Sequence, residues 1–120
     1  MGFIHIPVSV TAPGRSQDRY EASFLIDTGA IDSMAPSNEL QKVGIEPVGR
    51  KTYELADGTY KEFAFGIAQI EFLGAITGGL VLFGPDDAEP LLGVTALESA
   101  GITVDPATQT LRKLPHALRL

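Results

Sequence analysis

The sequence has no cysteine, and histidine occurs only twice, as His5 and His116. Without cysteine the chain has no disulfides and no thiolate ligands for a metal. A zinc centre or a Ser-His-Asp triad would depend on one of the two histidines, which stand near opposite ends of the chain. We therefore expect no metal site and no cofactor.

Basic residues and long apolar runs are also scarce. Nine Lys and Arg stand against fifteen Asp and Glu, which gives a net charge of −6. A chain this acidic lacks the positive surface that phosphate backbones require, so we expect no nucleic-acid partner. The longest apolar stretch, from Ala75 to Phe83, is interrupted by Thr77-Gly78-Gly79 and is too short to cross a bilayer. Because the N-terminal residues also lack the pattern of a signal peptide, the sequence predicts a soluble cytoplasmic protein with no membrane partner.

What is present is typical of one folded domain. The chain has 120 residues, of which 44% are hydrophobic and 20% charged, enough for a single modest core. We assign residues 1–114 to this domain and residues 115–120 to a short C-terminal tail.

Most of the sequence has the pattern of short strands separated by turns. Alternating apolar residues from Ile4 to Val10 predict a half-buried strand, and Pro7 places it at an edge or a dimer boundary because proline cannot donate to a neighbouring strand. Further strands are predicted over residues 20–26, 51–55, 59–65, 67–72, 80–83, 102–104 and 110–114. Short helices are predicted over residues 37–43, with Ser37 as the N-cap and Gly44 as the stop, and over residues 95–100. The pattern indicates a closed or nearly closed all-β domain with one or two short helices.

The tripeptide Asp27-Thr28-Gly29 follows directly after the apolar run Phe24-Leu25-Ile26. A carboxylate in this place is held at the end of a rigid strand, beside surroundings of low dielectric. The Thr28 hydroxyl can brace the loop, and Gly29 permits a backbone conformation, or a close substrate approach, that a Cβ would forbid. Asp and Gly are also common turn residues, so an ordinary strand-ending turn explains the tripeptide about equally well.

Two further features favour a functional role for the tripeptide. Asp57-Gly58 is a strong hairpin signal between two strand patterns. Leu91-Leu92-Gly93 leads into a short helical segment that ends at Gly101. Each feature has an ordinary structural explanation, a β-hairpin or a buried strand before a helix, but the order of all three is specific.

In this order the motifs resemble the retroviral-like (retropepsin-type) aspartic proteases, most closely their small single-domain microbial members. The resemblance runs from about Phe3 to Leu114 and implies a closed acid-protease barrel with one lobe per chain. It places residues 24–30 on the catalytic loop, residues 55–59 on the flap, and residues 91–93 on the segment that crosses behind the loop. Asp27 is then the catalytic residue, with Thr28 and Gly29 as support for its loop. The implied substrate contacts are Gly29, Ala30, Ala56, Asp57 and Gly58.

The chain also departs from the viral pattern. Ile31 stands where viral members usually carry Asp or Ser, and Val94-Thr95 replace a basic or amide residue followed by an acid. We therefore expect the ion pair that those residues make near the dimer contact to be missing. The flap also lacks the glycine-rich tip of the viral enzymes.

Peptide hydrolysis by this mechanism needs two carboxylates that share one proton. The chain has one copy of the motif, because Asp32-Ser33-Met34 lacks the glycine and Asp57-Gly58-Thr59 has the wrong order. The second carboxylate must then come from a second subunit. We predict a homodimeric aspartic endopeptidase that acts on polypeptides. The alternatives are a non-catalytic peptide-binding or dimerisation module on the same fold, and a plain β-barrel with accidental motifs.

Two other groups of residues have weaker functional interpretations. Asp86, Asp87 and Glu89 form an acidic group in a proline-bounded loop. The spacing of an EF-hand calcium loop is absent, so a solvated loop is expected. The leucines of the segment 114–120 fit either docking on a partner subunit or a frayed terminus.

Overall fold

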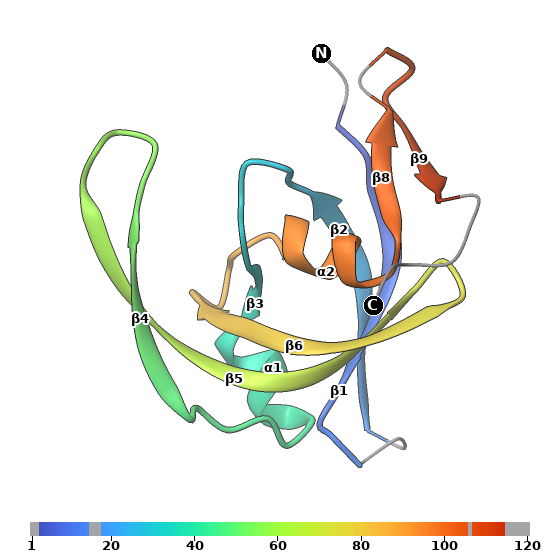
Figure 1. Cartoon of the computed structure of the whole chain (residues 1–120). Coiled ribbons are helices and arrows are strands. Elements are labelled where there is room, and N and C mark those ends of the chain that lie inside the picture. Colours follow the sequence, from blue (N-terminus) through green and yellow to red (C-terminus); the bar gives the residue numbers. More distant parts are fainter. Residues whose placement is uncertain (1–2, 15–17, 106, 115–120) are drawn as a thin grey trace.

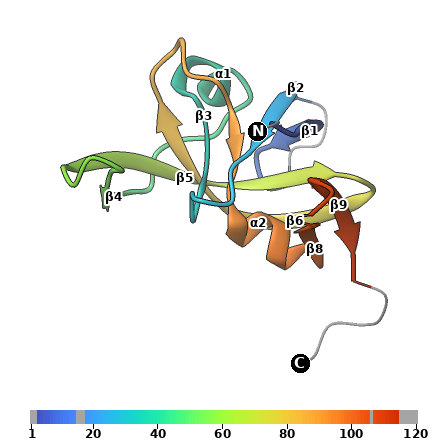
Figure 2. The same ribbon diagram turned by 90° about the horizontal axis from the view of Figure 1, so that it is seen from above.

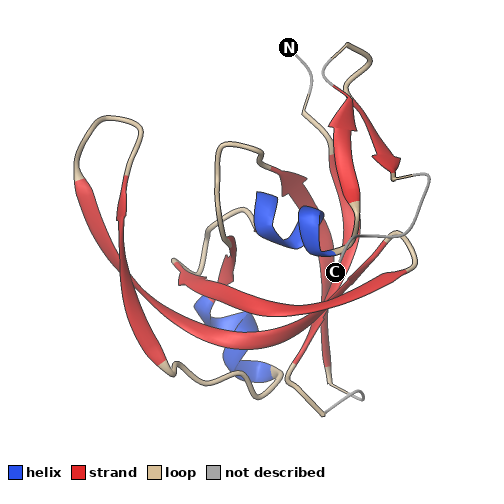
Figure 3. Ribbon diagram, viewed as in Figure 1, coloured by secondary structure: helices blue, strands red, loops and turns tan. Residues whose placement is uncertain are grey.

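The computed structural model describes residues 3–14, 18–105 and 107–114. These residues form nine strands and two short helices (Figures 1 and 3). The elements are β1 (His5–Thr11), β2 (Arg19–Ile26), β3 (Ser33–Pro36), α1 (Ser37–Lys42), β4 (Gly49–Glu54), β5 (Tyr60–Phe72), β6 (Ala75–Gly84), β7 (Leu91–Leu92), α2 (Val94–Ser99), β8 (Ile102–Asp105) and β9 (Thr110–Lys113). The expected all-β class is confirmed. The tail over residues 115–120 lies outside the described residues, and so does Pro106.

The larger sheet has the strand order β1-β2-β7-β3-β6-β5-β4, and β8 pairs with β9 in a second sheet. β1 is antiparallel to β2 along its whole length, and its last residues, Ser9 to Thr11, also pair with β5. The succession of paired strands thus returns to β1 and leaves β4 at the end of the sheet. Pro7 lies where β1 pairs with β2 alone, which agrees with the edge position expected for proline.

The long strand β5 corrects one prediction. Two strands were predicted over residues 59–65 and 67–72, but the structure has a single strand of 13 residues. Gly66 stands between the two predicted halves because of packing. A Cβ there would lie 2.7 Å from Ile45 Cγ2 and 2.9 Å from the Glu46 carbonyl oxygen. The glycine thus permits a close approach within a continuous strand and does not mark a break.

Strands β3 and β6 correct two further predictions from the sequence. β3 was not predicted, since its four residues are too few to show alternation. β6 begins at Ala75, so Gly78-Gly79 lies inside the strand and not before it. β3 runs parallel to the end of β6 and touches β7 at Met34. It therefore places the residues that follow Asp27 beside the centre of the sheet.

The core lies between the curved sheet and the two helices, which flank the long strand β5 (Figure 2). The large apolar side chains that are almost fully buried come from six elements and the turn after α1: Phe24, Leu40, Ile45, Leu92, Leu97, Val10 and Val81. Leu92 and Leu97 stand just before and inside α2, so the segment that crosses the Asp27 loop is itself part of the core. Neither helix is long and apolar enough to cross a membrane, as far as the described residues go.

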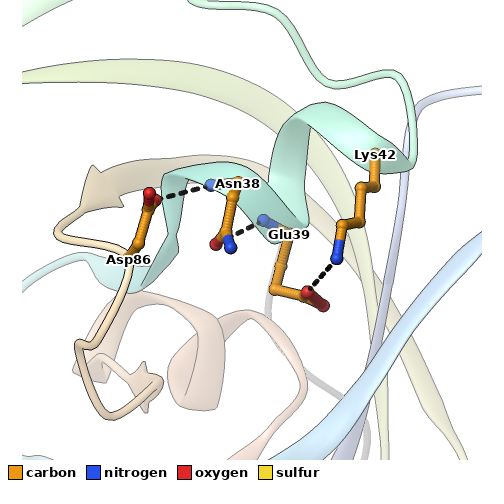
Figure 4. A network of polar contacts seen from close by, with 4 residues as sticks. All are labelled: Asn38, Glu39, Lys42 and Asp86. Carbon is orange, nitrogen blue, oxygen red and sulfur yellow. Dashed lines mark hydrogen bonds and ion pairs between the residues drawn. The ribbon is translucent and has the colours of Figure 1, made fainter.

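Helix α1 begins differently from the prediction. Ser37 was expected to cap the helix, but the N-cap position is Pro36 and the Ser37 hydroxyl donates to the Gly84 carbonyl at 2.7 Å. The Asn38 amide instead donates to a carboxylate oxygen of Asp86, at 3.0 Å, from the loop after β6 (Figure 4). Asp86 therefore stabilises the first turn of a helix, where an acceptor and a negative charge are both favourable.

Candidate active site

Asp27 is the first residue after β2, at a point where three segments meet. The Ile26 amide donates to the Ile4 carbonyl at 2.8 Å, and the Asp27 amide donates to the Leu92 carbonyl at 3.0 Å. Strands β2 and β7 run parallel here, with Ile26 opposite Leu92. The backbone of Asp27 is thus fixed by neighbours on both sides, and its side chain is half-buried.

The carboxylate of Asp27 is oriented by its own loop. The Gly29 amide donates to Asp27 Oδ1 at 3.0 Å, and the Ala30 amide donates to the Asp27 carbonyl at 3.1 Å. Gly29 does not have a positive φ, so the prediction that it supplies an unusual backbone conformation is wrong. A Cβ there would lie 3.3 Å from Asp27 Oδ1. Its small size therefore leaves room for the carboxylate.

The segment after β7 crosses directly against this loop. A Cβ on Gly93 would lie 2.6 Å from the Asp32 carbonyl carbon, so the backbones touch there. The Gly93 amide donates to the buried Ser33 hydroxyl at 3.0 Å, and the Val94 amide donates to the Ala30 carbonyl at 2.8 Å. The start of α2 thus holds the loop through bonds that its main-chain amides donate.

A cavity of about 740 Å³ opens beside Asp27, between its loop and the hairpin of β4 and β5. In Figure 1 the hairpin and the loop after β2 lie at the same end of the molecule. Three groups line the cavity: Asp27, Gly29, Ala30, Ile31, Asp32 and Met34 from the loop and β3; Lys51, Thr52, Tyr53, Glu54, Leu55, Ala56 and Phe63 from the hairpin; and Leu82 of β6 and Leu91 of β7. The site therefore combines one oriented carboxylate with apolar side chains and a hairpin wall.

Four of the predicted site residues share this cavity, namely Asp27, Gly29, Ala30 and Ala56. Thr28 does not. It lines a separate cavity of about 530 Å³, together with Phe3, Ile4 and residues of α2 and β8. The Thr28 side chain is exposed beside this second cavity. That its hydroxyl braces the Asp27 loop stays a prediction.

Asp57 and Gly58 form the turn of the expected hairpin but are not among the residues that line the cavity. Gly58 has φ +85 and its amide donates to the Leu55 carbonyl at 2.9 Å. The hydroxyl and the amide of Thr59 donate to Asp57 Oδ1 at 2.6 and 3.0 Å. These two bonds hold the pKa of Asp57 below its ordinary value. These bonds thus join residues of the hairpin tip to one another, and the part of the hairpin nearer the sheet lines the cavity.

Sequence reasoning missed the polar group on the cavity wall. Tyr53 donates its hydroxyl to Asp32 Oδ2 at 2.5 Å, and Lys51 Nζ lies 3.4 Å from the same oxygen. The Asp32 side chain is only 8% exposed. Burial, followed by the bond to Asp32 and the charge of Asp32, raises the pKa of Tyr53. Asp32 lies close to Asp27 in the sequence, which was a signal that it stands near the site. Nothing in the sequence indicated its bond to a tyrosine 21 residues later.

Comparisons with known proteins add no assignment: a scan of protein-family models finds no match to the chain, and a search of curated proteins finds no significant match. Among residues 3–14, 18–105 and 107–114, no group of three or more His, Asp or Glu side chains is placed to hold a metal ion.

Proposed function

We propose that the protein is one subunit of a homodimeric aspartic endopeptidase with a retropepsin-like fold. The observation that carries this proposal is the half-buried carboxylate of Asp27, oriented by the Gly29 amide and facing a cavity walled by a hairpin. The return of the strand pairings to β1 and the crossing of β7 beside β2 support the fold. Each is what the resemblance of the motifs to retropepsin-type proteases implies.

Two Asp27 carboxylates that share one proton divide the chemistry between them. The ionised carboxylate takes a proton from a water molecule, whose oxygen forms a bond to the peptide carbonyl carbon. The protonated carboxylate donates its proton to the carbonyl oxygen. When the C–N bond of the resulting tetrahedral intermediate breaks, the first carboxylate gives the proton it took from water to the leaving amine. The second carboxylate takes the proton of the hydroxyl that re-forms the C=O bond, and the pair again holds one proton. Two carboxylates in hydrogen-bond contact cannot both ionise, because their negative charges repel, so the pair keeps one proton.

The second carboxylate of the pair has no counterpart within the described chain. Asp32 also lines the cavity, but its Oδ2 accepts the Tyr53 hydroxyl and faces Lys51. Glu54 is exposed and lies on the hairpin wall. A two-fold axis beside Asp27 would supply the missing group from an identical subunit.

The partner subunit has a candidate contact surface next to the loop. Thr28, Ile4 and Phe3 line the separate cavity on that side, and Phe3 is 73% exposed. Burial of such apolar surface favours association. A contact here brings the partner's loop next to Thr28, one residue from Asp27.

An extended peptide is the substrate that this cavity suits. Among the described strands, β4 pairs only with β5, so its other edge is free to bind a peptide backbone. Met34, Phe63 and Leu82 give the cavity apolar surface for substrate side chains. The hairpin above would exclude water during the reaction.

The test is cleavage of a peptide library between pH 4 and 7 by the wild type, Asp27→Asn and the matched control Asp87→Asn. Asp87 is an exposed carboxylate in the loop after β6, so its substitution should leave cleavage unchanged. Loss of Asp27 should lower kcat/KM by about 10²- to 10⁴-fold, the usual contribution of a positioned acid or base. Equal cleavage by wild type and Asp27→Asn would contradict the assignment. Peptide binding without cleavage by the wild type would favour a non-catalytic binding module.

A further inference from the structure

We infer that Tyr53 and Asp32 form a latch that fixes the β4–β5 hairpin over the cavity and thereby tunes substrate affinity. The existence of the latch rests on geometry alone. Its consequence for substrate rests on the proposed protease function. Both residues are positioning residues, because they act on the hairpin and not on the reacting atoms.

The hairpin has few other ties to the body of the protein. β4 is the last strand of the sheet, and it pairs with β5 through Gly49–Glu54 only. Beyond Phe65 the strand β5 continues into pairing with β6, so the part made of β4 and the first half of β5 projects from the sheet (Figure 1). The bond from Tyr53 to Asp32 connects this projection to the catalytic loop across the cavity.

Both ends of the latch are held in place. The Tyr53 ring packs edge-on against Phe63 of β5, with ring centroids 6.0 Å apart and an interplanar angle of 68°. On the other side, the backbone of Asp32 lies against Gly93, and the next residue, Ser33, bonds the Gly93 amide. A hydroxyl on the projecting hairpin thus meets an 8%-exposed carboxylate whose backbone packs against the segment before α2.

The groups around Tyr53 and Asp32 favour the hydrogen bond between them. The raised pKa of Tyr53 keeps its hydroxyl protonated, and hence a donor, well into the alkaline range. Lys51 Nζ, 3.4 Å from Asp32 Oδ2, partly balances the buried charge. Hydrogen bonds to a charged acceptor are among the stronger ones in proteins.

Loss of the latch should allow the hairpin to open. If only the closed hairpin binds peptide well, the apparent affinity equals the affinity of the closed form multiplied by the fraction of molecules whose hairpin is closed. Once substrate has closed the hairpin, Asp27 has the same surroundings as before. We therefore expect KM to rise about ten- to hundredfold, as the loss of a bond to a charged group would give, with kcat changed much less.

The decisive variant is Tyr53→Phe, which removes only the hydroxyl, with Tyr60→Phe as the matched control. Tyr60 lies on the same hairpin, and its side chain is 72% exposed. ¹⁵N relaxation dispersion of the amides of residues 54–60 reports microsecond-to-millisecond opening, and peptide cleavage gives KM and kcat. Tyr53→Phe should show new exchange at these amides and a higher KM, whereas Tyr60→Phe should match the wild type. In a background of Asp32→Ala, the Tyr53→Phe substitution should have little further effect on either quantity.

The two measurements separate failure of the latch from failure of the proposed function. Wild-type-like dispersion in Tyr53→Phe overturns the latch, whether or not the protein cleaves peptides. New exchange in Tyr53→Phe alone supports the latch even if no peptide is cleaved, and in that case only the protease proposal fails. If Tyr53→Phe lowers kcat and leaves KM unchanged, the inferred role in affinity is wrong.

Discussion

At the scale of single residues, the candidate site depends on the absence of side chains as much as on their presence. Gly29 leaves space for the Asp27 carboxylate, and Gly93 lets the segment after β7 touch the backbone of the loop. Neither glycine has a positive φ. Both are therefore explained by close packing, which sequence reasoning cannot distinguish from a turn requirement.

Substitution Gly93→Ala should destabilise the protein. The added Cβ would lie 2.6 and 2.7 Å from the carbonyl carbon and oxygen of Asp32, backbone atoms that cannot rotate away. We expect the free energy of unfolding to fall by about 1–3 kcal/mol, as in other overpacked sites, measured by urea denaturation. Gly78→Ala is the matched control, because nothing lies within 4 Å of its Cβ position. Equal stability of the two variants would show that the loop and the crossing segment can move apart at little cost.

Asp57 gives a prediction about pH at the same scale. Its pKa is lowered from 3.8, first by the Thr59 hydroxyl and then by the Thr59 amide. A carboxyl with a lowered pKa in the folded state adds stability above its ordinary pKa, and this stability is lost as the pH falls through the lowered value. Thr59→Ala should therefore raise the pKa of Asp57, as followed by ¹³C NMR titration of its carboxyl carbon. Asp105, whose pKa is lowered by the Ala107 and Thr108 amides, serves as the internal reference, and its titration should not change.

At the scale of secondary structure, the sequence predicts well where a local signal exists. Apolar alternation predicts β1, and the Asp57-Gly58 pair predicts the hairpin turn. The prediction fails for β3, which has four residues and is held by neighbours distant in the sequence, and for the continuity of β5 through Gly66. The same limit applies to the site. Its loop was found from a motif, whereas the bond between Tyr53 and Asp32 depends on tertiary contact alone.

At the scale of the whole molecule, the main consequence of the proposal is that one chain holds half a site. Asp27 lies between two cavities: Asp27 itself lines one of them, and the next residue, Thr28, lines the other. On the proposed function, a subunit placed against the Thr28 surface supplies the second carboxylate of the pair. Activity should then depend on protein concentration in the range where the dimer dissociates.

Mixing subunits tests this arrangement directly. If wild type and Asp27→Asn chains are mixed in equal amounts and allowed to exchange, about one quarter of the dimers contain two intact carboxylates, as random pairing of a two-fold dimer requires. The cleavage rate at fixed total protein should fall to about one quarter of the wild-type rate, because a mixed dimer lacks one of the two groups that share the proton. Mixing with Asp87→Asn chains controls for effects of mixing itself and should leave the rate unchanged. A rate that falls only to about one half, although mixed dimers have formed, would mean that each chain works independently, and the second proton-sharing group would then have to lie within the same chain as Asp27.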